Sequence, residues 1–347
     1  MVSTAYFDIQ RQAFAEAVDR LGECAPVHFH LAGTGFTIRS AGAALTETRW
    51  FRALEHLRVE TPDPDSWNIF AWDDQEADWT WRIPESEFAQ GMQTNHLPKL
   101  SSESIRVFHQ DWLGVYSAIN RETREAFYVP EEVSRIPSCE RAAPMRTILN
   151  FLLNEKGFQM VHAAAIALSN GTSLLLPGSG GSGKSTTAFR WITQGHRYQG
   201  DDLCAIGGTD KIETIAVYQS AKLRSTSESF FPELSSPFER IEEFGEEKLL
   251  FHLDEMEGDI LIERAAAVGI VLPQIGREAK TIWGPAKPME VMKAVIPQTT
   301  LQVPKSDNRG GSIMMDVIAR LSAWKVELGT DPDDLISTLE GFFSGDV

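Results

Sequence analysis

The chain has 347 residues, and at roughly 150 residues per domain this length predicts two domains. Hydrophobic residues make up 42% of the sequence and charged residues 23%. This composition excludes bulk disorder, because it supplies enough apolar material for a full core. The net charge of −17 gives the chain no electrostatic reason to bind nucleic acid or an anionic membrane.

The sequence has no segment that indicates a membrane span or an export signal. The longest apolar run, residues 265–272, is far shorter than the roughly 18 residues that a span requires. Asp8 and Arg11 lie where a signal peptide would have its apolar core. The three cysteines form neither a disulfide framework nor a metal-binding spacing. We therefore expect a cytoplasmic protein.

Residues 1–138 are expected to form an α+β domain that contacts the acceptor substrate or a partner. Alternating apolar residues predict strands over 27–33 and 35–40, and a strand pair over 67–84. Apolar residues near helical spacing predict one amphipathic helix over 43–57. The tryptophans that gather in this domain are expected to serve the core and interfaces, although a ligand platform is the alternative.

Residues 139–347 are expected to form the second domain, in which strands and helices alternate. A helix is predicted over 144–156, followed by strands over 161–168 and 172–177. A glycine-rich loop, a helix ending at Gly195 and a strand over 198–206 complete a βαβ pattern. The remaining predicted elements are a strand over 265–273, helices over 288–296 and 312–322, a strand over 324–329 and a helix over 331–343.

An acidic stretch interrupts this domain over residues 230–260. It contains ten Asp and Glu residues against Arg240 and Lys248. Apolar residues remain frequent in it, so we expect an ordered surface insertion with a solvated face. Binding of a basic partner peptide is the alternative.

The glycine-rich loop carries the clearest chemical signal of the sequence. Residues 178–185 match the pattern G-x-x-x-x-G-K-[ST] (Walker A), in which backbone N–H groups and a helix N-terminus cradle phosphate oxygens. Lys184 would reach the terminal phosphates, and the Ser185 hydroxyl would bind Mg²⁺. The sequence thus predicts ATP and Mg²⁺ as cofactors. The nucleotide-binding residues are expected to be Gly178, Ser179, Gly180, Gly181, Ser182, Gly183, Lys184, Ser185 and Thr186.

Two adjacent aspartates, Asp201 and Asp202, follow on the next predicted strand. A crossover connection usually returns the next strand beside the first and parallel to it. Neighbouring strand residues point to opposite faces, so one aspartate would face Mg²⁺ and the other the acceptor. The motifs of transporter ATPases (LSGGQ), guanine-specific GTPases (N-K-x-D) and protein kinases (H-R-D) are absent from the sequence.

Four segments of this domain form a pattern: His162-Ala-Ala-Ala, Pro177-Gly178 with the loop, Gly195-His-Arg-Tyr and Asp201-Asp202-Leu. Together they resemble the catalytic core of HPr kinase/phosphorylase. They resemble still more closely the HPr-kinase-related serine kinases, which include kinases of lasso-peptide precursors. The resemblance implies a P-loop kinase core of the HPr kinase C-terminal-domain type, with a phosphoenolpyruvate-carboxykinase-like mixed sheet, preceded here by the smaller α+β domain.

The resemblance also implies roles for individual residues. His162 would lie in the active site, Asp201 would act as the base toward the acceptor hydroxyl, and Asp202 would serve the metal together with Ser185. The Arg-Gly-x-Gly signature of HPr kinase has no counterpart between residues 204 and 230. That segment contains Lys222 and Arg224 instead, for which a surface role is favoured over contact with phosphate.

The function expected from the sequence is that of an ATP- and Mg²⁺-dependent kinase. Lys184 would stabilise the transferring phosphate and Asp201 would deprotonate the acceptor, a serine of a peptide or small protein. A small-molecule hydroxyl kinase and a non-catalytic nucleotide-binding regulator are the alternatives. The sequence leaves open whether the chain forms a homo-oligomer.

Overall fold

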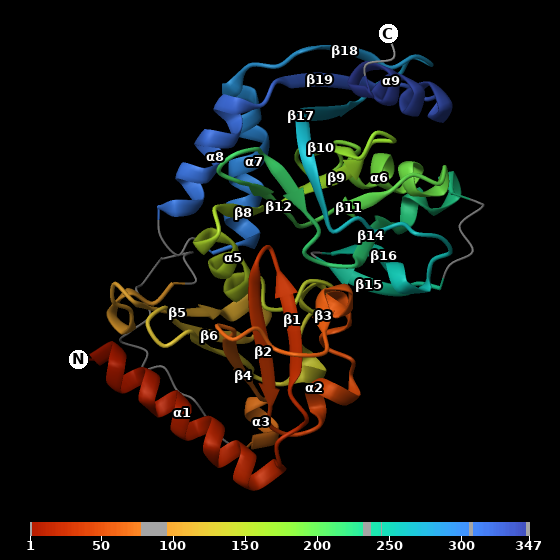
Figure 1. The fold of residues 1–347 in the computed structure, drawn as a ribbon. Helices are drawn as coiled ribbons and strands as arrows, with labels where there is room; N and C mark the ends of the chain where they lie inside the picture. Colours follow the sequence, from red (N-terminus) through yellow and green to blue (C-terminus); the bar gives the residue numbers. More distant parts are fainter. Residues whose placement is uncertain (1, 78–95, 232–236, 244, 305–307, 345–347) are drawn as a thin grey trace. The chain divides into compact units, whose positions relative to one another are not determined.

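Two units divide the chain in the computed structural model, which describes residues 2–77, 96–231, 237–243, 245–304 and 308–344 (Figure 1). The first unit comprises Met1–Leu152 with Pro304–Asp307, and the second Leu153–Val303 with Asn308–Val347. Both are mixed α/β structures whose sheets combine parallel and antiparallel pairs. None of the helices in the described ranges combines the length and apolar character that a membrane crossing needs.

The division between the units falls later than the expected boundary at 138/139. Buried polar contacts account for the difference, because they join the segment after residue 138 to the first unit. The Tyr128 hydroxyl donates to Glu140 Oε1 at 3.0 Å, and Arg146 Nε lies 3.2 Å from Glu140 Oε2. Breaking such a network would leave buried charge uncompensated, so this segment stays with the first unit.

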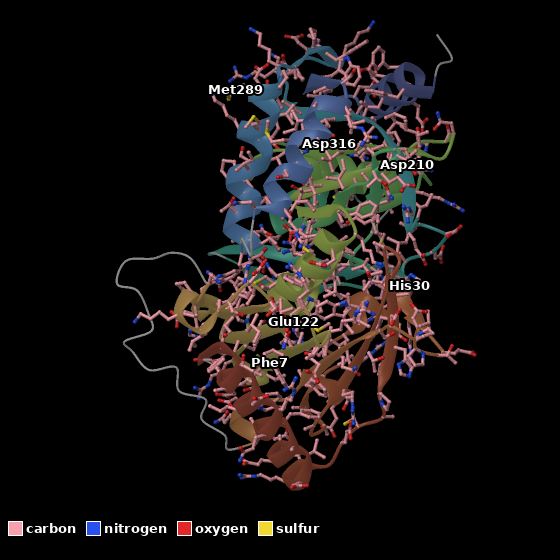
Figure 2. The ribbon with its side chains drawn as sticks, turned by 60° about the vertical axis from the view of Figure 1, so that its left-hand side comes forward. Phe7, His30, Glu122, Asp210, Met289 and Asp316 are labelled. Carbon is pink, nitrogen blue, oxygen red and sulfur yellow. The ribbon has the colours of Figure 1, made fainter. Side chains whose placement is uncertain are left out.

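The first unit is built on one sheet flanked by helices. Its described strands lie in the order β3 (Arg58–Val59), β1 (Val27–Leu31), β2 (Thr34–Ser40), β4 (Trp67–Ala71), β7 (Glu125–Pro130), β6 (Val115–Asn120) and β5 (Ile105–Gln110). Its helices are α1 (Val2–Leu21), α2 (Ala44–Glu47), α3 (Asp74–Ala77) and α4 (Ser138–Ala142), and α5 (Arg146–Glu155) begins in this unit and ends in the second. Phe7 of α1, labelled in Figure 2, is buried against Phe127 of β7.

Strands are confirmed within the predicted ranges 27–33, 35–40 and 67–74, although β1 ends at Leu31, β4 ends at Ala71 and Asp74 begins α3. Most of the second half of the predicted pair at 67–84 lies outside the described residues. The single helix predicted over 43–57 is wrong. Helix α2 ends at Glu47, Arg49 has a φ of 52°, and a 3₁₀ segment follows at Arg52–Leu57.

The spacing of two apolar residues explains this break. Leu45 and Trp50 are both buried, yet they are five residues apart, which on a continuous α-helix places them about 140° from each other. The left-handed residue at Arg49 turns the chain so that both side chains reach the core.

The second unit is built on a larger mixed sheet. The described strands of its main path lie in the order β11 (Tyr198–Gly200), β9 (Ala163–Ala167), β10 (Thr172–Pro177), β17 (Arg264–Ile275), β13 (Glu213–Ile215), β12 (Cys204–Gly207) and β8 (Phe158–Val161). Strand β19 (Ala323–Leu328) pairs with β17 in parallel, and β18 (Ile282–Pro285) pairs with β19. A separate small sheet has the order β14 (Ser220–Arg224), β16 (Glu246–His252), β15 (Glu239–Glu243).

Both faces of the larger sheet are covered. On β10, Leu174 and Leu176 belong to an apolar cluster with helices α6 (Lys184–Thr193) and α9 (Pro332–Ser344) and the small sheet. Leu175 points the other way, into a cluster with α7 (Pro288–Gln302) and α8 (Arg309–Arg320). This alternation explains why β10 is apolar at successive positions.

The strand predicted over 172–177 is confirmed at the same bounds by β10, and the helix ending at Gly195 is confirmed by α6. Three details differ from the prediction. The strand predicted over 198–206 is two short strands, β11 and β12. The crossover does not return beside β10, because β9 lies between β10 and β11. His162 does not begin a strand: it occupies a bend between β8 and β9.

We predict that Tyr128→Phe lowers the free energy of unfolding by about 1–3 kcal/mol, because two buried partners lose a hydrogen bond. The Tyr128 hydroxyl accepts from Trp50 Nε1 at 3.0 Å and donates to Glu140. Urea unfolding followed by tryptophan fluorescence measures the change. The loss on adding Trp50→Phe should be less than additive; fully additive losses would contradict the shared bond.

Candidate active site

A tight loop connects the buried strand β10 to helix α6 in the second unit. The strand ends at Pro177 and the helix begins at Lys184, so residues 178–183 form the loop. Gly183 has a φ of 103°, and a Cβ atom there would lie 2.4 Å from Leu328 Cδ1. Only glycine satisfies both constraints. The loop therefore places its backbone groups beside the N-terminus of a ten-residue helix, and backbone N–H groups in such a position are suited to binding an anion.

Lys184 spans this loop. Its ammonium donates to the carbonyl oxygens of Gly178 at 2.6 Å and Ser179 at 3.0 Å. Burial lowers the pKa of Lys184, while Asp202 and Asp201 oppose that shift. Ser182 Oγ in the same loop is buried without a hydrogen-bond partner among the described residues. A polar ligand would satisfy such a group.

Asp201 follows strand β11 and is almost fully buried, with 2% of its surface exposed. Its Oδ1 accepts from the Tyr198 hydroxyl at 3.0 Å, and its Oδ2 accepts from the backbone N–H of Lys222 at 3.2 Å. Burial, followed by the adjacent charge of Asp202, raises the pKa of Asp201 to about 6. Its carboxylate is thus held in a fixed orientation and titrates near neutrality.

Asp202 has a different environment from its neighbour. Its Oδ1 lies 3.2 Å from His162 Nδ1, and its Oδ2 lies 2.6 Å from Lys222 Nζ. Burial by itself would raise the pKa of Asp202, but Lys222 and His162 hold it well below its usual range. The pairing of Cys204 with Val161 across β12 and β8 explains why His162 reaches this aspartate.

The small sheet supplies further cations, and the expected surface position is wrong for one of them. Lys222 is buried rather than on the surface, so its expected surface role is wrong. Arg224, also on β14, lies 3.6 Å from the positions that Cβ atoms of Gly180 and Gly181 would take. Lys248 enters from β16, opposite Arg224 in the strand register. Within the acidic stretch, the described residues 237–243 and 245–260 form strands β15 and β16 and their flanks, and Lys248 shows that they are more than a solvated face.

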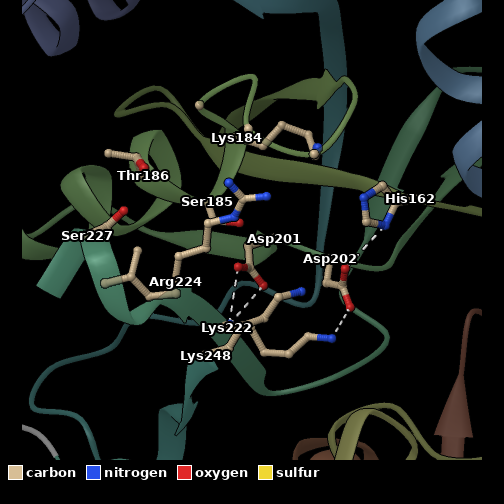
Figure 3. A pocket seen from close by; sticks show the side chains of 14 residues that line it. His162, Lys184, Ser185, Thr186, Asp201, Asp202, Lys222, Arg224, Ser227 and Lys248 are labelled. Atoms are coloured by element: carbon tan, nitrogen blue, oxygen red, sulfur yellow. Dashed lines mark hydrogen bonds and ion pairs between the residues drawn. The ribbon is translucent and has the colours of Figure 1, made fainter. Parts of the chain in front are cut away.

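These residues line one pocket of about 620 Å³, its open mouth included (Figure 3). Its lining comprises His162, Gly180, Gly181, Gly183, Lys184, Ser185, Thr186, Asp201, Asp202, Lys222, Leu223, Arg224, Ser227 and Lys248. Of the predicted site residues, Gly178, Ser179 and Ser182 are not in this lining, although two of them hold Lys184. Reasoning from the sequence missed Ser227 and Lys248, because no motif marks them.

The pocket fits a phosphate group together with a divalent cation. Lys184, Lys222, Arg224 and Lys248 all line it, and cations are what phosphate requires. The described residues contain no group of three or more His, Cys, Asp or Glu side chains arranged for a metal. Mg²⁺ commonly binds through one or two carboxylates and substrate phosphates. Asp202 and Ser185 are the residues that would hold it.

Comparisons with known proteins add little to this geometry. No family model matches the sequence, and no curated protein matches it. Among solved structures, the Hpr(Ser) kinase/phosphatase from Coxiella burnetii is similar over 52% of this chain and 93% of its own, with 11% sequence identity and a TM-score of 0.29. Similarity at this level carries no argument about fold or function.

The raised pKa of Asp201 predicts how stability depends on pH. Burial raises this pKa from 3.8 to about 6, so the folded chain keeps a proton that the unfolded chain loses. The stabilising contribution is complete below about pH 4 and is lost as the pH rises through 6. The free energy of unfolding of the wild type, relative to Asp201→Asn, should fall by about 2–3 kcal/mol between pH 4 and pH 7.

Urea unfolding without nucleotide and with a chelator measures this difference. The matched control is Asp210→Asn, because Asp210 is exposed (Figure 2) and should show no such trend. A difference between wild type and Asp201→Asn that stays constant with pH would contradict the raised pKa.

Proposed function

We propose that the protein is an ATP- and Mg²⁺-dependent kinase that transfers the γ-phosphate to a hydroxyl, with a serine of a peptide or small protein as the acceptor. One observation carries the proposal. A buried carboxylate whose pKa lies near neutrality, Asp201, lines the same pocket as the glycine loop and Lys184. A phosphate cradle alone would need no such group.

The loop and the cations support binding of a nucleoside triphosphate. Backbone N–H groups of the loop and the N-terminus of α6 are suited to the phosphate chain. Lys184 would exchange its contacts with the Gly178 and Ser179 carbonyls for phosphate oxygens. Arg224, beside Gly180 and Gly181, would add charge on the opposite side of the loop.

Asp201 has the properties of a general base. A base works best when its pKa lies near the working pH, and the hydrogen bonds from Tyr198 and Lys222 fix its orientation. The acceptor oxygen would form a bond to the γ-phosphorus as the bond from that phosphorus to the β,γ-bridging oxygen breaks. The hydroxyl proton would pass to Asp201, and ADP would leave.

Asp202 has the properties of a metal ligand, because its low pKa keeps it ionised. Bound Mg²⁺ would neutralise charge on the phosphates. His162 would orient the Asp202 carboxylate through its contact with Oδ1. The two adjacent aspartates thus suit different tasks.

The acceptor class is tested by incubating the protein with γ-labelled ATP and Mg²⁺. Serine-containing peptides, free serine and hydroxyl-bearing metabolites are offered separately. Label on a peptide serine supports the proposal, and label on a small molecule favours the small-molecule kinase. ATP binding that alters binding of a partner, with no transfer of label, would replace the proposal with a regulator.

Lys184→Ala should abolish turnover or weaken ATP binding at least tenfold, on the order of 1.4 kcal/mol or more. The substitution removes the cation expected to meet the terminal phosphates and leaves the loop backbone in place. Titration calorimetry and label transfer measure the two effects. Lys293→Ala, at an exposed site on α7, is the control; wild-type behaviour of Lys184→Ala would exclude a phosphate role for this lysine.

The aspartate substitutions should separate base from metal ligand. Asp201→Asn should leave Mg·ATP binding nearly unchanged while kcat falls by about 10²–10⁴, because a base acts only in the chemical step. Asp202→Asn should raise the Mg²⁺ concentration required and lower turnover together. Phosphate transfer at saturating ATP, with binding measured in parallel, checks both. Transfer at the wild-type rate in both variants would refute the kinase.

A further inference from the structure

Lys222 has several contacts in this pocket, and the roles proposed above for the loop and the aspartate pair do not use its side chain. Its side chain is 7% exposed, and its ammonium lies 2.6 Å from Asp202 Oδ2. The same ammonium lies 2.9 and 3.2 Å from the two carboxylate oxygens of Glu243. Its backbone N–H donates to Asp201. One residue of β14 therefore contacts three carboxylates.

These contacts leave Asp202 with both oxygens engaged. Oδ1 faces His162 and Oδ2 faces Lys222. Figure 3 shows the Lys222 ammonium directed at Oδ2, and an ammonium at this distance competes with any other cation for the same oxygen. A metal that approaches Oδ2 from this direction would have to displace the Lys222 ammonium.

Glu243 gives Lys222 a second partner. This glutamate belongs to β15 of the small sheet, is buried, and does not line the pocket. Burial would raise the pKa of Glu243, but Lys222 and Lys248 hold it below its usual range. An ammonium that left Asp202 without another partner would be a buried, uncompensated charge. With Glu243 beside it, Lys222 can leave Oδ2 and remain paired.

We propose that Lys222 is a catalytic residue that moves between two sets of partners. Before nucleotide binds, its ammonium bridges Asp202 and Glu243 and occupies the metal's place at Oδ2. When Mg·ATP binds, Lys222 leaves Oδ2, stays paired with Glu243 and contacts the phosphates. Glu243 is the positioning residue: it keeps the Lys222 ammonium paired, so that leaving Asp202 does not leave a buried charge without a partner. This inference rests on the proposed kinase function.

The test measures binding of a fluorescent, non-hydrolysable ATP analogue over a range of Mg²⁺ concentrations. Lys222→Met should lower the half-saturating Mg²⁺ concentration about tenfold, because the competitor for Asp202 is gone. Glu243→Gln should raise it by a similar factor, because Lys222 then has Asp202 as its main partner. In the double variant, Glu243→Gln should have no further effect, because it acts through Lys222.

Two controls separate this exchange from a general effect of charge. Lys248→Met also removes a cation that lines the pocket and contacts Glu243, but it should shift the Mg²⁺ requirement much less than Lys222→Met. Glu242→Gln changes the exposed neighbour of Glu243 and should leave the requirement unchanged. Additive shifts in the double variant, or equal shifts for the two lysines, would overturn the inference.

Turnover supplies an independent readout. Lys222→Met should need less Mg²⁺ to bind nucleotide and yet lower kcat about 10²-fold, because a charge directed at the phosphates is lost. Lys222→Arg should restore part of the kcat. A wild-type kcat in Lys222→Met would overturn the catalytic role.

If Lys222→Met does not fold, Lys222→Gln replaces it in the comparison of single and double variants. The experiment also distinguishes failure of the proposed function from failure of this inference alone. If the wild type binds no nucleotide, the proposed function fails and this inference fails with it. If the wild type binds and transfers phosphate without the predicted shifts, the inference alone fails.

Discussion

Two carboxylates on adjacent residues, both largely withdrawn from water, are the constraint on which the rest of the second unit depends. Such a pair repels itself, and each member would raise the pKa of the other unless the surroundings distinguish them. Here they do. Asp201 receives hydrogen bonds from the Tyr198 hydroxyl and the Lys222 backbone, and Asp202 receives the charges of Lys222 and His162. One carboxylate therefore titrates near neutrality while the other stays ionised, and the small sheet must be present to supply the cation.

The acidity of the whole chain does not conflict with the proposed phosphate site. The distance and burial of the nearby charges affect a bound anion more than the net charge of the chain does. The chain carries a net charge of −17, yet four cationic side chains line one pocket. Exposed carboxylates are screened by water and salt over roughly 8–10 Å, whereas cations inside a pocket act at close range. The acidic stretch itself contributes Lys248 to the pocket.

The sequence was most informative where chemistry and local geometry coincide. The loop, Lys184 and the strand at 172–177 could be predicted because a glycine-rich turn between a buried strand and a helix has a strong local pattern. Lys222 and Lys248 could not, since their position depends on a strand register between segments more than twenty residues apart. The break at Arg49 was missed because tertiary burial of Trp50 outweighed local helical periodicity, and the place of β11 beside β9 was missed because crossovers need not join neighbours.

The packing of Gly183 against Leu328 ties the glycine-rich loop to a strand that follows it by more than a hundred residues. Strand β17 pairs in parallel with both β10 and β19. Pairing between segments so far apart in the sequence costs loop-closure entropy before any stabilising contact forms. The loop is therefore synthesised early but acquires its support late. On the ribosome, a nascent chain that ends before β19 would contain the complete glycine motif but would lack Leu328, against which Gly183 packs. The geometry of the glycine-rich loop should therefore be complete only after β19 has been added to the sheet.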